Sequence, residues 1–314
     1  MEPDIRDEII DYLKTMPERT GIRTKTLLKW MGISQSKYYA WRERQGTLNQ
    51  HKGTTPLLNE ILPWERKAII DYARTHPEEG CRRLTYMMLD EDIVASSPST
   101  TYRVLKSAGL FNLKKGGKAN LKKTGFDQPK RPHEQWHTDI KYVNFQGTFL
   151  FLISVIDGYS RYIVHHELRT SMEEYDVEIT LQRALEKYPQ EKPRLISDNG
   201  SQYISKDFAQ FLRLAGLQHT RTSLAYPQSN GKIERFHQSL KQECLRKRSL
   251  IDLMDARKQI GEYIDYYNRK RLHSALFYLT PEDFLTGKVE ERLKAREQKL
   301  RQAKWKRMEV NHVA

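Results

Sequence analysis

Three carboxylates in the second half of the chain, Asp139, Asp198 and Glu234, stand where metal-dependent chemistry could occur. Each is expected at the end or edge of a secondary-structure element: a first strand, a fourth strand and the first turn of a helix. Carboxylate oxygens are hard ligands of the kind that Mg²⁺ or Mn²⁺ prefers. Two such ions, about 3.5–4 Å apart, can activate the attacking oxygen and stabilise the leaving oxygen of a phosphodiester displacement.

Taken singly, each acid also has a structural interpretation. Asp139 could be a buried acid in a strand, and Asp198 could cap the turn at Asn199-Gly200. Glu234 could favour the positive end of its own helix. The metal-site hypothesis therefore depends on the elements that would bring the three together.

Those elements follow one another from residue 132 to residue 285. Strands are expected at 135–143, 148–156, 162–168, 194–197 and 218–222, and helices at 172–188, 206–214 and from 233 onward. This β-β-β-α-β-α-β-α order predicts an α/β, RNase H-like core, a mixed five-stranded sheet with helices on both faces. In that fold the first and fourth strands are neighbours and the helix after the last strand crosses near their ends, so the three carboxylates would converge.

Two all-α units precede this core. Residues 1–50 contain short helices around Gly32, the last of them capped by Ser34, which is typical of a helix-turn-helix. Residues 60–111 repeat the pattern as a second helix-turn-helix-like unit. An ordinary three-helix bundle with no DNA contact is the alternative interpretation of the N-terminal unit.

Two basic segments complete the chain. Residues 112–131 combine many lysines with glycines, which indicates a linker that is either a solvated tether or a segment that binds the DNA backbone. Residues 286–314 form a basic, helical C-terminal tail. This tail could be a solvated helix with its own charge pairs or an arm that binds DNA or a partner protein.

Composition narrows the class of partner. The 54 lysines and arginines exceed the 40 acids, giving a net charge of +14, and a basic excess of that size usually means a polyanion such as nucleic acid. The cysteines, Cys81 and Cys244, form no zinc-binding pattern and suit a reducing compartment. With no apolar signal segment and no apolar run long enough to cross a membrane, we expect a soluble, intracellular protein.

The spacing of the acids resembles a known signature. Thirty-five residues separate Asp198 from Glu234, as in the D,D(35)E motif of retroviral integrases and bacterial insertion-sequence transposases. Flanking segments between residues 65 and 285 resemble the same group: Trp136–Asp139, Asp157–Arg161, Asp198–Tyr203, Pro227–Arg235, and His273–Leu276 followed by Thr280-Pro281. Because no His-His-Cys-Cys zinc module is present, the resemblance points to a bacterial, IS-three-like transposase. Many of its relatives divide the helix-turn-helix and catalytic parts between two reading frames, whereas this chain combines them.

The resemblance implies a DNA transposase that cuts transposon ends to free a 3′-hydroxyl and joins that hydroxyl to target DNA. It implies Asp139, Asp198 and Glu234 as catalytic ligands of two Mg²⁺ ions, with Mn²⁺ as a substitute. It also implies double-stranded DNA, namely terminal repeats and target, as partner, and a homodimer or larger homo-oligomer in a synaptic complex. A cellular RNase H-like nuclease and a catalytically inactive DNA-binding regulator are the alternatives.

Candidate DNA contacts follow from exposure and charge. Near the carboxylates they are Lys241, His237, Gln238 and Asn199, together with Tyr226 and Gln228 in the loop before Glu234. In the helical units and the linker they are Arg82, Arg83, Lys37, Tyr38, Lys114, Lys115, Lys122 and Lys123. Lysine and arginine would meet phosphates, whereas the tyrosine and glutamine of the loop would separate bases near the cut.

Overall fold

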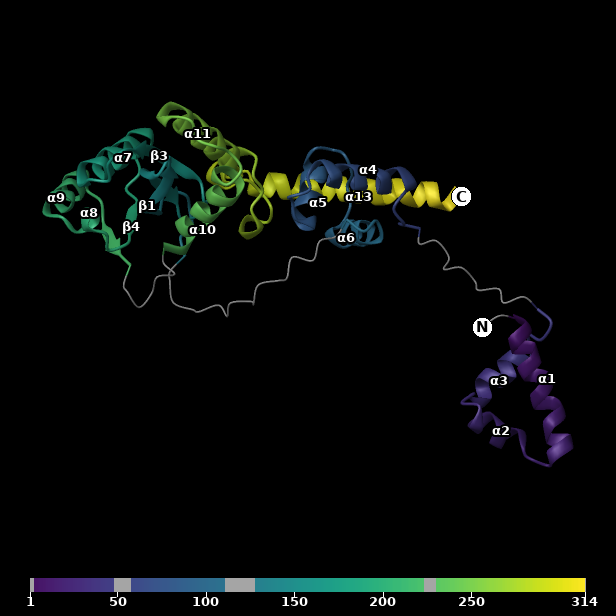
Figure 1. Cartoon of the computed structure of the whole chain (residues 1–314). Helices are drawn as coiled ribbons and strands as arrows, with labels where there is room; N and C mark the ends of the chain where they lie inside the picture. The colour runs from purple at the N-terminus through teal and green to yellow at the C-terminus, as the bar shows by residue number, and fades with distance from the viewer. Residues whose placement is uncertain (1–2, 48–57, 111–127, 223–229, 314) are drawn as a thin grey trace. The chain divides into compact units, whose positions relative to one another are not determined.

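The computed structural model describes residues 3–47, 58–110, 128–222 and 230–313, and the chain forms two compact units, Met1–Leu57 and Leu58–Ala314 (Figure 1). The first unit holds α1 (Pro3–Thr20), α2 (Thr24–Trp30) and α3 (Gln35–Arg42). Its core is formed by Leu13, Leu27, Leu28 and Tyr38. The Ser34 side chain accepts a hydrogen bond from Lys37 N and so begins α3, as the sequence predicted.

The second unit opens with three more helices: α4 (Pro63–Thr75), α5 (Cys81–Asp90) and α6 (Pro98–Ser107). Ile69, Leu84, Met88 and Val104 lie at the centre of their shared core. Ser97 accepts from Thr100 N, and Pro98 follows in the first turn, where its missing N–H costs nothing.

A five-stranded sheet follows, in the spatial order β3-β2-β1-β4-β5. Its strands are β1 (Gln135–Phe145), β2 (Thr148–Asp157), β3 (Ile163–Arg169), β4 (Arg194–Ser197) and β5 (His219–Arg221). The first three pair antiparallel, whereas β1 with β4 and β4 with β5 pair parallel. The expected mixed sheet of an RNase H-like core, with its first and fourth strands adjacent, is confirmed.

Each face of the sheet is covered by helices. Against one face pack α7 (Glu174–Lys187), the short α8 (Ser201–Ile204) and α9 (Lys206–Ala215), around Trp136 and Phe208. Against the other pack α10 (Gly231–Leu240) and α11 (Leu253–Arg269), around Phe236 and Ile260. α10 continues directly into a π-helix, η2 (Lys241–Leu245). Two apolar layers thus fix where α10 crosses the sheet.

The chain ends in short elements and one long helix. The 3-10 turn η3 (Ser274–Leu276) and α12 (Pro281–Leu285) lead to α13 (Val289–Val313), which runs along α4–α6. The sequence left open a solvated tail or a binding arm, but α13 instead packs within its own unit. No helix in the described ranges is both long and apolar enough to cross a lipid bilayer.

Candidate functional site

Asp139 and Asp198 lie on neighbouring strands at the same level. In the parallel pairing of β1 with β4, His137 is opposite Ile196. Asp139 follows His137 by two residues within β1, and Asp198 follows Ile196 by two residues, directly after the end of β4. Parallel strands are about 4.8 Å apart, so the two carboxylates meet at one edge of the sheet. The hydroxyl of Tyr203 is buried close to both aspartates. Burial is the main cause that raises the Tyr203 pKa, and the charges of Asp139 and Asp198 raise it further.

Glu234 lies in the first turn of α10, which packs against β1. Asn230, Glu234, His237 and Lys241 are spaced by four, three and four residues, which aligns them on a single face that we call the Asn230 face. His237 Nδ1 lies 3.4 Å from Asp139 Oδ2. Asn230 lies beside the ring of His137, which precedes Asp139 by two residues on β1. Glu234, itself exposed, therefore sits between two residues that touch β1.

One oxygen of each aspartate accepts a hydrogen bond from a nearby backbone N–H group. Asp139 Oδ1 accepts from Ile140 N at 2.9 Å, and Asp198 Oδ1 accepts from Gly200 N at 3.0 Å. The second contact is the turn cap that the sequence suggested for Asp198. Within residues 3–47, 58–110, 128–222 and 230–313, no three His, Cys, Asp or Glu side chains are close enough to hold a metal ion together. The donor set, three carboxylates from three elements, nevertheless suits Mg²⁺.

His237 differs from its predicted role as an exposed DNA contact. Its side chain is buried beside Asp139, and its Nε2 atom makes no hydrogen bond to any described residue. A buried imidazole in contact with a carboxylate helps to orient that carboxylate. We therefore correct the prediction: His237 contacts the Asp139 side chain and does not face the DNA. Gln238 on α10 and Lys241 at the start of η2, in contrast, are exposed, as the prediction required.

Of the other residues predicted to contact DNA, some are exposed in the structure and others are buried. Asn199 is exposed, but its amide donates to Thr222 O at 2.7 Å and so fixes β5 to the turn after β4. Tyr38 is buried in the core of the first unit, which makes its prediction as a duplex contact wrong because no face is left for DNA. Lys37 is exposed and lies over the Trp41 ring, 4.9 Å from its centroid.

Arg82 is exposed on α5, whereas Arg83 forms an ion pair with Glu79 at 2.6 Å. The remaining predicted contacts lie outside the described residues: Tyr226, Gln228, Lys114, Lys115, Lys122 and Lys123.

Asp157 is a residue whose role the sequence did not reveal, although its motif stood out. Its fully buried carboxylate accepts from His133 N at 2.8 Å, Ser160 N at 2.7 Å and Ser160 Oγ at 2.6 Å. The turn that it holds presents the Gly158 carbonyl to Lys232 Nζ on α10, 2.8 Å away. Burial, and next the charge of Arg161, lower the Lys232 pKa to about 7. The motif thus anchors the start of the helix that carries Glu234.

Gly158 permits this anchoring because a side chain there would collide with fixed atoms. A Cβ would lie 3.0 Å from both Gln135 O and His137 Nε2. We expect Gly158→Ala to lower the free energy of unfolding by about 1–3 kcal/mol. The matched control, Gly261→Ala within α11, meets no atom within 4 Å and should stabilise by about 0.5–1 kcal/mol. Urea unfolding of the two variants checks the contrast, and equal effects would contradict it.

A second polar cluster supports η2, immediately after α10. Arg271 Nε and Nη2 donate to Glu243 at 2.7 and 2.6 Å, and Arg271 Nη1 lies 3.0 Å from His273 Nε2. Because a guanidinium only donates, His273 Nε2 must accept, and the ring must be neutral. Burial first, and then the Arg271 charge, lower the His273 pKa to about 3.

This histidine should make the fold acid-sensitive. Between the unfolded pKa of about 6.5 and the folded value near 3, the unfolded chain binds more protons. The free energy of unfolding should therefore fall as pH drops through that window, by at most about 1.4 kcal/mol per pH unit for this residue. His273→Gln keeps an acceptor but does not titrate, so its stability should fall less between pH 7 and pH 4. Urea titrations test this, with the exposed His312→Gln as control; a slope unchanged by His273→Gln would contradict it.

Comparison with known proteins identifies the family. Two models described as integrase core domain match residues 129–227 and 215–281. An insertion element IS136 protein of Agrobacterium fabrum is 31% identical over 166 residues, covering 50% of this chain and 85% of that protein. The chain belongs to the integrase core family of insertion-sequence transposases.

Other members of the family match over shorter shares of their length. The transposase for insertion element IS904 of Lactococcus lactis is 33% identical over 155 residues, 49% of this chain and 61% of that protein. The chain therefore matches less than two thirds of the length of that relative. Among solved structures, the catalytic core of HTLV-2 integrase aligns with a TM-score of 0.41 at 16% identity, over 50% of this chain and 98% of its own.

Proposed function

We propose that the chain is a DNA transposase that binds transposon ends, cuts them to free a 3′-hydroxyl and joins that hydroxyl to target DNA. The observation that carries the proposal is the strand register, because it brings Asp139 and Asp198 to one sheet edge. Glu234 lies in the first turn of α10, one helical turn before His237, whose Nδ1 atom lies 3.4 Å from Asp139 Oδ2. Membership of the integrase core family agrees with this chemistry.

In this proposal the three carboxylates hold two Mg²⁺ ions, for which Mn²⁺ can substitute. Bound ions would supply Lewis-acid activation of the attacking oxygen and neutralise charge on the leaving oxygen. Two contacts within the chain would orient the carboxylates. His237 contacts the Asp139 carboxylate, and Lys232 donates to Gly158 O at the start of α10. Lys241, at the start of η2 and almost two turns after Glu234, is exposed and would bind a DNA phosphate.

The DNA contacts complete the proposal. The net charge of +14 suits a polyanionic partner, and exposed Arg82 and Lys37 are accessible to a duplex. Two transposon ends must be held together for joining, so we propose a homodimer or a larger assembly as the working form. The helical units 1–50 and 60–111, with the linker 112–131, would bind the ends, and the core 132–285 would carry out the reaction.

The experiment supplies the full chain with DNA carrying the inverted repeats that flank its gene. With Mg²⁺ we expect 3′-end cleavage at the repeat boundary and joined products, and with EDTA only binding. Binding without cleavage in either Mg²⁺ or Mn²⁺ would instead indicate an inactive DNA-binding regulator. Cleavage that ignores the repeats but degrades RNA–DNA hybrids would indicate an RNase H-like nuclease.

A further inference from the structure

The basic residues of α13 are turned inward at four positions along one side of the helix. Arg292, Arg296, Lys299 and Arg307 recur at intervals of four, three and eight residues, which keeps them on one face. Each pairs with an acid outside α13: Arg292 and Arg296 with Asp90, Lys299 with Asp92, and Arg307 with Glu65. The apolar residues Leu293 and Trp305 remain exposed, at 37% and 65%. Polar contacts, more than hydrophobic ones, therefore dock α13 on the helices α4–α6.

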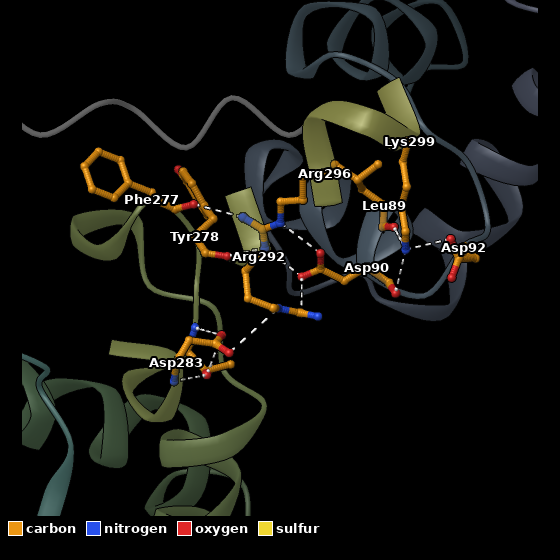
Figure 2. A network of polar contacts seen from close by, with 10 residues as sticks. Leu89, Asp90, Asp92, Phe277, Tyr278, Asp283, Arg292, Arg296 and Lys299 are labelled. Carbon is orange, nitrogen blue, oxygen red and sulfur yellow. Dashed lines mark hydrogen bonds and ion pairs between the residues drawn. The ribbon is translucent and has the colours of Figure 1, made fainter. Parts of the chain in front are cut away.

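Arg296 is the most heavily bonded of these residues (Figure 2). Its guanidinium donates to Asp90 Oδ1 at 2.8 Å and to Asp90 Oδ2 at 2.6 Å, at the end of α5. It also donates to the backbone carbonyls of Phe277 at 3.0 Å and Tyr278 at 2.6 Å. One buried side chain thus ties three segments together, which a surface ion pair cannot do.

The Phe277-Tyr278 segment is unusual in its backbone. Both residues have left-handed φ angles, 52° and 57°, a conformation that costs energy for residues with bulky side chains. Tyr278 stacks on Tyr86 of α5, with ring centroids 4.8 Å apart, and the Arg296 guanidinium lies 4.8 Å above the same Tyr86 ring. These contacts stabilise a strained turn in one position against the helical unit.

From Tyr278 a short chain of contacts leads to the helix that carries Glu234. Tyr278 N donates to His273 O at 2.8 Å, and His273 contacts Arg271, which is bonded to Glu243. Glu243 belongs to η2, the direct continuation of α10. A second contact joins the same parts, because Lys247, just after η2, forms an ion pair with Glu78, just before α5.

We propose that Arg296 is a positioning residue that sets the helical unit, residues 58–110, at a fixed distance and angle from the helix carrying Glu234. DNA held by the helical unit would then meet the carboxylates at one phosphate. The role in cutting rests on the proposed function, whereas the role in holding the two parts together does not.

The first test measures distance in the full chain without DNA. Spin labels are attached at Lys106→Cys on α6 and Gln182→Cys on α7, both exposed, in a Cys81→Ser, Cys244→Ala background. We expect a narrow distance distribution, which broadens in Arg296→Ala and in the milder, shape-preserving Asp90→Asn. Arg301→Ala is the matched control, since Arg301 pairs only with Glu297 on the exposed side of α13 in the described contacts, and it should stay narrow. A narrow distribution in both Arg296→Ala and Asp90→Asn would overturn the proposal.

The second test maps the cut. On DNA with the flanking repeats, we expect the wild type and Arg301→Ala to cut at one phosphate. Arg296→Ala and Asp90→Asn should cut at several neighbouring phosphates, an effect that a mere loss of folded protein would not produce. A broadened distance with an unchanged cut position would overturn the positioning role. If the wild type itself does not cut, the proposed function fails, and the distance measurement alone decides whether Arg296 holds the two parts together.

Discussion

Replacing Asp139 or Asp198 with asparagine, or Glu234 with glutamine, is expected to reduce metal-dependent end cleavage and joining roughly 10³-fold or more. The amides keep the shape of the side chains but lose the charge that a hard divalent ion requires. A metal ion stabilises the charge of the transition state by several kcal/mol, and each 1.36 kcal/mol lost is a factor of ten in rate. Gel assays of cleaved and joined products at saturating Mg²⁺ measure the loss.

DNA binding and folding should survive these three changes. Asp139 and Asp198 are adjacent like charges, so neutralising one should leave the unfolding free energy unchanged or slightly higher. Asp207→Asn is the matched control, because Asp207 is an exposed acid in the first turn of α9, as Glu234 is in α10. Asp207→Asn should cut and join as the wild type does. Full joining activity in any of the three site variants would remove that residue from the site.

Much of this site could be read from the sequence because local patterns encode it. Alternating and continuous apolar runs located the first strands of the sheet, and the order of elements then placed β1 beside β4. The structure pairs these two strands in the register that brings Asp139 and Asp198 to one level. Helical spacing also separated Glu234 from Ile233 and Phe236, both of which are buried.

His237 shows where such reasoning stops. The sequence predicted it as a DNA contact near the carboxylates, whereas the structure buries its side chain against Asp139. Helical periodicity gives the direction in which a side chain leaves its helix, not what another element brings toward it. Tyr38 failed for the same reason: its own helix leaves it free, and the packing of α1 and α2 covers it.

The docking of α13 could not be predicted from sequence at all. Arg296 and Asp90 are 206 residues apart, and Arg307 and Glu65 are 242 apart. A basic stripe with few apolar residues is equally typical of a solvated helix and of a DNA-binding arm. Only the long-range arrangement of Glu65, Asp90 and Asp92 turns that stripe into an internal contact, because ion pairs leave no periodic apolar signal.

The ion pair that closes the far end of this contact should have a large effect on stability. Arg307 donates to Glu65 through Nε and Nη2, both at 2.8 Å, and Glu65 also accepts from Leu62 N at 2.9 Å. The two side chains are 8% and 4% exposed, so solvent cannot replace a lost partner. Glu65→Ala would leave the Arg307 charge buried and unpaired. We expect it to lower the free energy of opening α13 by about 3–5 kcal/mol, measured by hydrogen exchange of the α13 amides.

A double-mutant cycle separates the ion pair from the loss of each side chain. Arg307→Ala alone should also cost several kcal/mol, because it strands the Glu65 carboxylate. The double variant should cost clearly less than the two single costs added together, since neither charge is then left alone. Glu297→Ala, which removes an exposed pair one turn apart on the same helix, should change the opening free energy by no more than about 0.5 kcal/mol. Additive costs in the cycle would mean that Glu65 and Arg307 stabilise α13 independently, and that the helix is held by its packing and not by its buried charges.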